Sequence, residues 1–238
     1  MKQLHNIQLG ILQRLLFSES LRYTDMKPSN LIENNRFQFH LDQLIKKYKF
    51  IRKINGRYKL TSIGKEYANR IDDKNAKVEK QAKISAWVCC IQKRGKKKKY
   101  LIGTRLKQPF YGCQGFISGK VKYGESIADA AKRELKEESG LAAEKVDVCA
   151  IVHFRVFKTK TNKLLEDKFM YLCAVYDPKG QIRTNKEVKL EWVERASLPK
   201  YLTNPFESKR DFFKFISLLE NFSGKPEFVE IDHFTNKF

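Results

Sequence analysis

The chain has 238 residues, enough for one large domain or two small ones, and its 42% hydrophobic content excludes wholesale disorder. No apolar run reaches the roughly 18–20 residues of a membrane span, and no signal-peptide core follows the first residues, so we expect a cytoplasmic protein without membrane contact. The 48 Lys and Arg against 27 Asp and Glu give a net charge of +21, which favours polyanionic partners such as nucleic acid or phosphorylated metabolites.

A polar stretch without apolar periodicity separates two segments with their own hydrophobic patterns. We therefore predict an N-terminal domain at 1–72, a linker at 73–83, a second domain at 84–221 and a C-terminal extension at 222–238. Residues 1–80 carry 17 basic and 8 acidic residues, and the rest carry 31 and 19. Both parts are basic, as a generally lysine-rich composition would also make them, so charge alone identifies no binding site.

Four helices are predicted in the N-terminal segment, the last of them a closing helix that begins at Thr61 and runs towards Ile71. Apolar spacing predicts amphipathic helices over 7–16 and 37–48, and a short helix over 22–27 stopped by Pro28. A tight hairpin follows, because strand-like runs at 50–54 and 57–61 flank Asn55-Gly56.

This element order, and the run from Phe39 to Gly64, resemble the recognition helix, wing and post-wing helix of winged helix-turn-helix regulators over about residues 1–72. The resemblance implies nucleic-acid binding, to DNA more than to RNA, with the third helix in the major groove and the wing on phosphates. A dimerisation or protein-docking module is the alternative, and for His40 a packed position on the helix. The residues assigned to nucleic acid are Asn35, Arg36, Gln38, His40 and Gln43 for base edges and Arg52, Lys53, Arg57 and Lys59 for the backbone.

Strands and helices alternate in the second segment. Apolar runs predict strands at 84–91, 100–106, 146–157, 168–176 and 188–193. Between them, a capping box at 126–129 begins a helix that Gly140 is placed to end, and an aromatic helix follows near 208–219. This order indicates a mixed sheet covered by helices.

The five cysteines are predicted to be buried, reduced thiols. They show no C-x-x-C pair and no nearby histidine cluster, so zinc binding has little support, and the odd count argues against a disulfide framework. Cys89 and Cys90 are neighbours in a strand-like run, where successive side chains point to opposite faces.

Three glutamates lie on one side of the central helix. Glu134, Glu137 and Glu138 have the i, i+3, i+4 spacing that places side chains on neighbouring positions. At the surface they would be solvated, whereas in a cleft they would require divalent cations, and hard oxygen ligands suit Mg²⁺ or Mn²⁺. Arg133 can orient a carboxylate by a charge-assisted hydrogen bond.

The surrounding spacing is more specific. Gly119, five residues, Glu125, seven residues and then 133–141 match every fixed position of the Nudix box, G-x5-E-x7-R-E-U-x-E-E-x-G-U. The segment 83–220 therefore resembles Nudix hydrolases. The resemblance implies an α/β/α sandwich with a mixed sheet, and Mg²⁺- or Mn²⁺-dependent hydrolysis of a nucleoside diphosphate linked to another moiety. It also implies that two or three cations neutralise the diphosphate and activate the attacking water.

The resemblance assigns roles to single residues. Glu134, Glu137 and Glu138 would bind metal, with a main-chain carbonyl at Ser118 or Gly119. The general base varies among Nudix enzymes, and the candidates are Glu134, Glu187 and Glu191, with an edge charge as the alternative for Glu191. We assign Arg133 to the catalytic group. We assign Lys120, Arg105 and Phe157 to substrate binding. The aromatic residues that could stack on a base, with core packing as the alternative, are Phe110, Tyr111, Phe116 and Phe157.

Two further functions stay open at the level of sequence. The chain could be a transcriptional regulator that senses a nucleotide metabolite through its second domain, or an enzyme that hydrolyses the 5′ end of RNA. Pairing of two copies as a homodimer is also left open.

Overall fold

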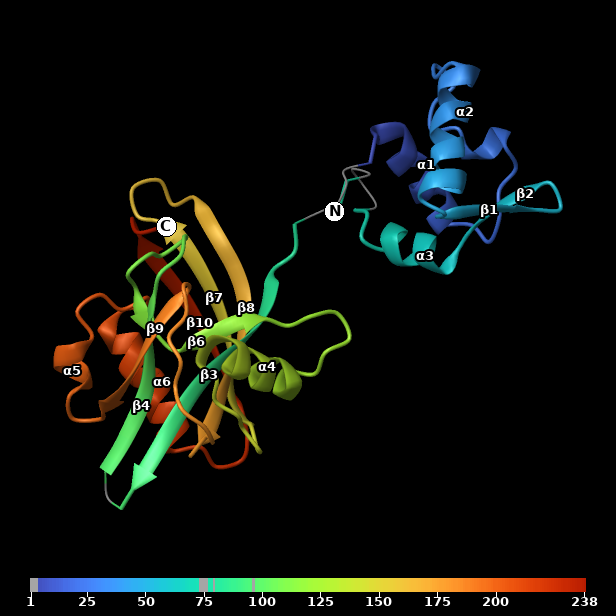
Figure 1. Cartoon of the computed structure of the whole chain (residues 1–238). Helices are drawn as coiled ribbons and strands as arrows, with labels where there is room; N and C mark the ends of the chain where they lie inside the picture. Colours follow the sequence, from blue (N-terminus) through green and yellow to red (C-terminus); the bar gives the residue numbers. More distant parts are fainter. Residues whose placement is uncertain (1–3, 73–76, 79, 96) are drawn as a thin grey trace. The chain divides into compact units, whose positions relative to one another are not determined.

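The computed structural model describes residues 4–72, 77–78, 80–95 and 97–238. The chain divides into two compact units, Met1–Lys80 and Gln81–Phe238, coloured blue to cyan and green to red in Figure 1. The division falls within the predicted linker, of which residues 73–76 and 79 lie outside the described part. No helix among the described residues has the length and apolarity needed to cross a bilayer.

The first unit combines helices with a two-stranded antiparallel sheet. Its elements are α1 (Asn6–Leu16), η1 (Thr24–Met26), α2 (Asn34–Asp42), η2 (Gln43–Lys47), β1 (Ile51–Ile54), β2 (Arg57–Leu60) and α3 (Ser62–Ala68). The predicted third helix is confirmed as α2 followed by the π-helical turn η2. The predicted hairpin is also confirmed, because Asn55 and Gly56 adopt the left-handed φ values of 49° and 75° that a two-residue turn of this kind requires.

The second unit is built on one mixed sheet of eight strands. Its elements are β3 (Lys83–Arg94), β4 (Lys97–Arg105), β5 (Gln114–Gly115), β6 (Ile117–Lys120), α4 (Ile127–Ser139), β7 (Asp147–Lys158), β8 (Leu164–Tyr176), β9 (Val188–Glu194), α5 (Leu198–Tyr201), α6 (Lys209–Glu220) and β10 (Glu227–Thr235). The main path of the sheet is β10-β7-β8-β3-β4-β5, with β6 on β3 and β9 on β4. The pairs β3–β8 and β7–β10 are parallel, and the others are antiparallel.

Strand β3 divides its pairing between two partners along one edge. Its first half pairs with β6, from Ser85 to Val88, and its second half pairs with β4, from Ile91 to Arg94. Residues of β3, β4 and β6 line the cavity described below, so this divergence helps to open it.

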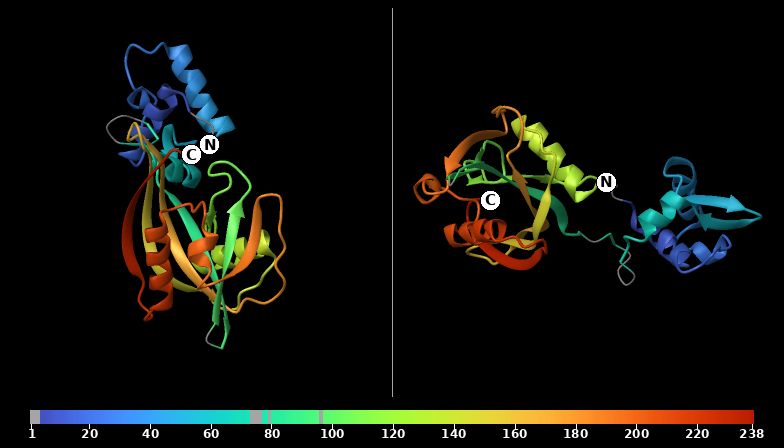
Figure 2. Two further views of the ribbon diagram at one scale, coloured as in Figure 1. Left: turned by 90° about the vertical axis from the view of Figure 1, so that its left-hand side faces the viewer. Right: turned by 90° about the horizontal axis from the view of Figure 1, so that it is seen from below.

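Helices cover both faces of the sheet, which confirms the predicted α/β/α layering. Trp87 and Cys89 belong to the core on the α6 side, whereas Val88 and Cys90 belong to the core on the α4 side, as strand alternation requires. Figure 2 shows α4 and α6 on opposite faces of the sheet. All five cysteines are buried and unbonded to one another, as predicted.

The segment 222–238 differs from the extension that we predicted. Its residues 227–235 form β10, which pairs in parallel with β7 at the edge of the sheet. Val229 and Ile231 contribute to the core, while charged side chains occupy alternate positions. The alternation of Val229 and Ile231 with Glu230 and Asp232 is the period-two pattern of a half-buried strand, which the prediction of an extension overlooked.

Candidate functional site

The predicted box forms a loop, the helix α4 and a second loop. The Ser126 hydroxyl accepts a hydrogen bond from the Asp129 main-chain amide at 3.1 Å, which begins the helix. Gly140 ends it with a left-handed φ of 76°. Leu135 packs into the core beneath α4, and the glutamates of the box lie outside that core.

Arg133 is the centre of the charged network around α4. Its Nε and Nη2 atoms donate to the Glu125 carboxylate at 2.6 and 2.9 Å, and Nη2 also donates to the Lys120 carbonyl at 3.0 Å. Its Nη1 atom donates to Glu134 at 2.6 Å and to Glu137 at 3.2 Å. Because of the Arg133 guanidinium and a main-chain amide, the pKa of Glu125 falls to about 2. Glu125 thus holds Arg133, which in turn orients two of the predicted metal ligands.

Gly119 is explained by its contact with Glu134. A Cβ atom at position 119 would lie 1.7 Å from the Cδ atom of Glu134, so only glycine lets the main chain of β6 approach that carboxylate. The Glu134 side chain is 13% exposed.

Glu138 is the most electrostatically perturbed acid of the helix. Burial raises its pKa to about 7, with a further rise from Glu134, and Lys107 and Arg105 offset part of this. Lys107 forms an ion pair with Glu187. Four carboxylates line one groove: Glu134, Glu137, Glu138 and Glu187.

The residues of this acidic groove fit a divalent cation by the kind of atom that they offer. Carboxylate oxygens are the preferred donors for Mg²⁺ or Mn²⁺. The raised pKa of Glu138 reflects its burial first and the neighbouring Glu134 second, and a cation beside the carboxylate would offset both. Among the described residues, however, no three acidic, His or Cys side chains converge on one point. Glu137 is 56% exposed, and Arg133 contacts it and Glu134 in the place of a cation.

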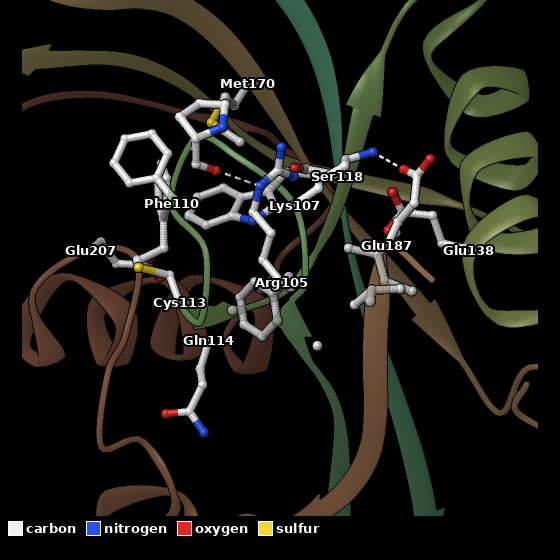
Figure 3. Close-up of a pocket in the computed structure, with 18 of the residues that line it drawn as sticks. Arg105, Lys107, Phe110, Cys113, Gln114, Ser118, Glu138, Met170, Glu187 and Glu207 are labelled. Atoms are coloured by element: carbon white, nitrogen blue, oxygen red, sulfur yellow. Dashed lines mark hydrogen bonds and ion pairs between the residues drawn. The ribbon is translucent and has the colours of Figure 1, made fainter. Parts of the chain in front are cut away.

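A cavity of about 360 Å³ adjoins the acidic groove, and the two share Lys107, Glu138 and Glu187. This volume is within the range of small-molecule sites. Its aromatic walls include Trp87, Phe110, Phe116 and Phe206. Figure 3 shows Glu138 and Glu187 on one side of the cavity and Phe110 and Glu207 on the other.

The cavity also contains three charged side chains that were not predicted from the sequence, those of Lys83, Glu166 and Lys168. Lys168 lies 2.6 Å from the Glu166 carboxylate, and Lys83 lies 3.0 Å from it. Burial lowers the pKa of Lys168, although Glu166 opposes this. The Arg105 guanidinium is fixed by donating to the Pro109 carbonyl at 2.7 Å.

Several predicted substrate-site residues do meet at this cavity. Those that line it are Arg105, Lys120, Glu138, Glu187, Phe110, Phe116 and Ser118. Phe157 is not among the lining residues, because on β7 it stacks on Phe234 with ring centroids 5.4 Å apart. Glu191 is also elsewhere: it accepts a hydrogen bond from the Tyr201 hydroxyl at 2.5 Å and lies 3.4 Å from Lys189, as expected of the edge-charge alternative.

The residues predicted to contact nucleic acid differ in their exposure and in their partners. Asn35, Arg36 and Gln38 on α2 and Arg52 and Lys53 on β1 are exposed. Of these, Gln38 donates a hydrogen bond to the Asp42 carboxylate at 2.7 Å.

His40 is only 8% exposed and stacks on His5 at 4.2 Å, so the structure favours the packed alternative. Gln43 accepts a hydrogen bond from Gln8 at 3.1 Å. Arg57 donates to the Ser20 hydroxyl at 2.7 Å, and Lys59 pairs with Glu19 at 2.6 Å.

Comparison with known proteins identifies the second unit. A family model of the NUDIX domain matches residues 83–214. Nudix hydrolase 7 of Arabidopsis thaliana is 26% identical over 102 residues, which are 42% of this chain and 34% of that protein. The chain thus matches about a third of the length of that relative.

Two solved structures share the fold. The NUDIX domain of Shewanella oneidensis NrtR, complexed with ADP ribose, superposes with a TM-score of 0.50 and 16% identity over 68% of this chain and 97% of that one. The mutator MutT protein of Bacillus halodurans gives a TM-score of 0.50 and 18% identity over 66% and 93% of the two chains. At these identities the likeness shows the fold alone.

Proposed function

This chain belongs to the NUDIX family, and we propose that it hydrolyses a phosphoanhydride bond of a nucleoside diphosphate linked to another moiety, with Mg²⁺ or Mn²⁺ as cofactor. The observation that carries the proposal is the acidic groove of α4 adjoining a cavity of ligand size, with Glu138 and Glu187 in both. A buried carboxyl group such as Glu138, whose pKa is raised by burial and by a neighbouring acid, is characteristic of functional sites when it lies in a cleft.

Different residues of the chain have different roles in this reaction. Cations held by Glu134, Glu137 and Glu138, when bound, would neutralise the diphosphate and make a bound water more acidic. Arg105 and Lys107, which line the cavity, are placed to pair with phosphate oxygens.

We assign the general base to Glu187 in preference to the other candidates. Glu187 lines both the cavity and the acidic groove, so its carboxylate can take a proton from water there. Glu134 lines the groove but not the cavity, and Glu191 lines neither. The water oxygen forms the new bond to phosphorus as the bridging oxygen leaves with the other half of the substrate.

The test is the release of phosphate and nucleotide from a panel of nucleoside diphosphate derivatives with Mg²⁺ or Mn²⁺. Glu138→Gln removes a metal ligand and Glu187→Gln removes the base, so each should lower kcat by about 100-fold or more. Glu191→Gln is the matched control and should stay within about twofold of the parent, as expected of an edge charge. Near-full activity of Glu138→Gln, or no turnover of any substrate by the parent, would contradict the proposal.

We also propose that the first unit is a winged helix-turn-helix domain that binds nucleic acid, with duplex DNA preferred. The exposed Arg36 on α2 and the exposed Arg52 and Lys53 of the hairpin support this, because cations beside a helix suited to the major groove can contact phosphates.

Binding of duplex DNA and of single-stranded RNA should be compared at equal salt. Affinity should fall steeply with salt, and Arg52→Ala should reduce the salt dependence by about one phosphate contact. A preference for RNA would instead support an enzyme acting on RNA ends. Indifference to both would contradict any nucleic-acid role.

A further inference from the structure

Glu207 is a buried carboxyl group without a partner inside the cavity. The residue is 2% exposed, and neither carboxylate oxygen makes a hydrogen bond within the part of the chain that the structure describes. It lines the cavity on the side away from Glu138 and Glu187, beside Phe110 and Cys113 (Figure 3). An unsatisfied buried polar group destabilises the fold, so a folded protein rarely keeps one without a use.

The segment that carries Glu207 is held in place by hydrogen bonds to β5. The Gln114 amide donates to the Asn204 carbonyl at 2.8 Å, and the Phe206 amide donates to the Gln114 carbonyl at 2.9 Å. The Gln114 side chain adds a hydrogen bond from the Asn204 amide at 3.0 Å. The main chain on both sides of the cavity wall that carries Glu207 is therefore held in place before any ligand arrives, which lowers the cost of binding.

The surroundings keep Glu207 uncharged. Burial raises its pKa to about 8, and Asp211 raises it further, while its own main-chain amide offsets only part of this. Lys168, a cation that lines the same cavity, is paired with Glu166. A neutral carboxyl group offers one hydrogen-bond donor and one acceptor side by side.

Aromatic walls surround this carboxyl group. Phe110 meets Phe206 edge to face at 4.5 Å, and Trp87 and Phe116 line the same cavity. Flat apolar walls with one fixed polar group suit a heterocyclic base, whose faces are apolar and whose edge carries donors and acceptors. The opposite side, with Glu138, Glu187 and Lys107, suits a diphosphate and its cations.

We propose that Glu207 recognises the base of the substrate and selects the edge shared by adenine and cytosine, an amino group beside an unprotonated ring nitrogen. The amino group donates to the carboxyl oxygen, and the carboxyl hydroxyl donates to the ring nitrogen. Uracil and guanine offer a ring N–H beside a carbonyl oxygen instead, and a ring nitrogen is a stronger acceptor than a carbonyl oxygen. This inference rests on the proposed function.

The experiment measures binding of the α,β-methylene analogues of ADP, CDP, GDP and UDP by titration calorimetry with Mg²⁺, since these analogues resist cleavage between the two phosphorus atoms. The parent protein should bind the adenine or cytosine analogue roughly tenfold or more tightly than the other two. The relative affinities of the ADP and CDP analogues identify the base. Glu207→Met removes both polar atoms and should bring all four affinities within about threefold.

Glu207→Gln separates the neutral carboxyl from an ionised one. An amide also offers one donor beside one acceptor, so this variant should retain the preference. Loss of the preference in Glu207→Gln would overturn the inference, because it would mean that a charged carboxylate sets the preference. Tightest binding of the guanine analogue would also overturn it, since the two adjacent donors of guanine, its ring N–H and its amino group, pair best with an ionised carboxylate. The exposed Glu227→Gln is the matched control and should bind like the parent.

The results of this experiment distinguish a failure of this inference from a failure of the proposed function. Hydrolysis of nucleoside diphosphate derivatives without base preference, or an unchanged preference in Glu207→Met, would overturn the inference and leave the proposed function standing. Failure of every analogue to bind, with no turnover of any derivative, would overturn both.

Discussion

Replacing Glu207 with glutamine should make the second unit more stable at neutral and alkaline pH. The pKa of Glu207 rises from the ordinary 4.5 to about 8 on folding, because the carboxyl group is buried without a partner among the described residues. The folded chain therefore keeps a proton over a pH range in which the unfolded chain has lost it. Stability is present in full below pH 4.5 and falls as the pH rises to about 8.

The size of this effect follows from the pKa values. One pKa unit is worth about 1.4 kcal/mol, so the rise from 4.5 to about 8 corresponds to a loss of about 4–5 kcal/mol in the free energy of unfolding. Relaxation and water entry at high pH reduce this value, so we expect Glu207→Gln to be more stable than the parent by about 3–4 kcal/mol at pH 8.5 and about equal at pH 4.5.

Urea unfolding followed by tryptophan fluorescence measures this difference. Both tryptophans, Trp87 and Trp192, belong to the second unit, so the signal reports that unit. The measurement is made in a chelator, from pH 4.5 to 8.5. Other charged groups near Glu207 are Asp211, Arg105, Glu166 and Lys168, with His233 and Lys237 of the C-terminal segment and the Cys113 thiol.

These neighbouring groups are the same in both proteins, so the difference between the two pH profiles isolates Glu207. The exposed Glu227→Gln should follow the parent profile. If the free energy of unfolding of the parent and of Glu207→Gln changed with pH in the same way, the prediction would be wrong, because the fold would then not hold the Glu207 carboxyl group neutral.

Three further predictions concern other parts of the molecule. Gly119→Ala should lower turnover about 100-fold or more, because its Cβ would lie 1.7 Å from Glu134 Cδ and would displace that carboxylate; turnover within about twofold of the parent in the same assay would contradict this. Gly64→Ala should destabilise the first unit by about 1–3 kcal/mol, because its Cβ would lie 2.0 Å from the Phe50 carbonyl oxygen; an unchanged far-ultraviolet circular dichroism melting curve would contradict this. Removal of divalent cations by a chelator should abolish turnover reversibly without loss of secondary structure, and activity in the chelator would count against a metal-dependent reaction.

Features that depend only on neighbouring residues in the chain could be predicted from the sequence. The cap at Ser126, the stop at Gly140 and the spacing of the box glutamates are local, because a helix places i, i+3 and i+4 side chains together wherever it lies. The Asn55-Gly56 turn is equally local, since the φ values it requires are those that these two residues tolerate. The strand alternation that separates Cys89 from Cys90 also needs only the backbone of one strand.

Contacts between residues far apart in the chain follow from the tertiary structure and could not be predicted from the sequence. Glu207 and Lys168 have no local pattern that marks them, and they reach the cavity because β5 binds the segment before α6 and β8 lies beside β3. Phe157 and His40 are of residue types suited to substrate binding and nucleic-acid binding, respectively. In the structure, however, Phe157 stacks on Phe234 and His40 stacks on His5. The physical reason is that burial and partnership depend on contacts between elements far apart in sequence, which no short-range periodicity encodes.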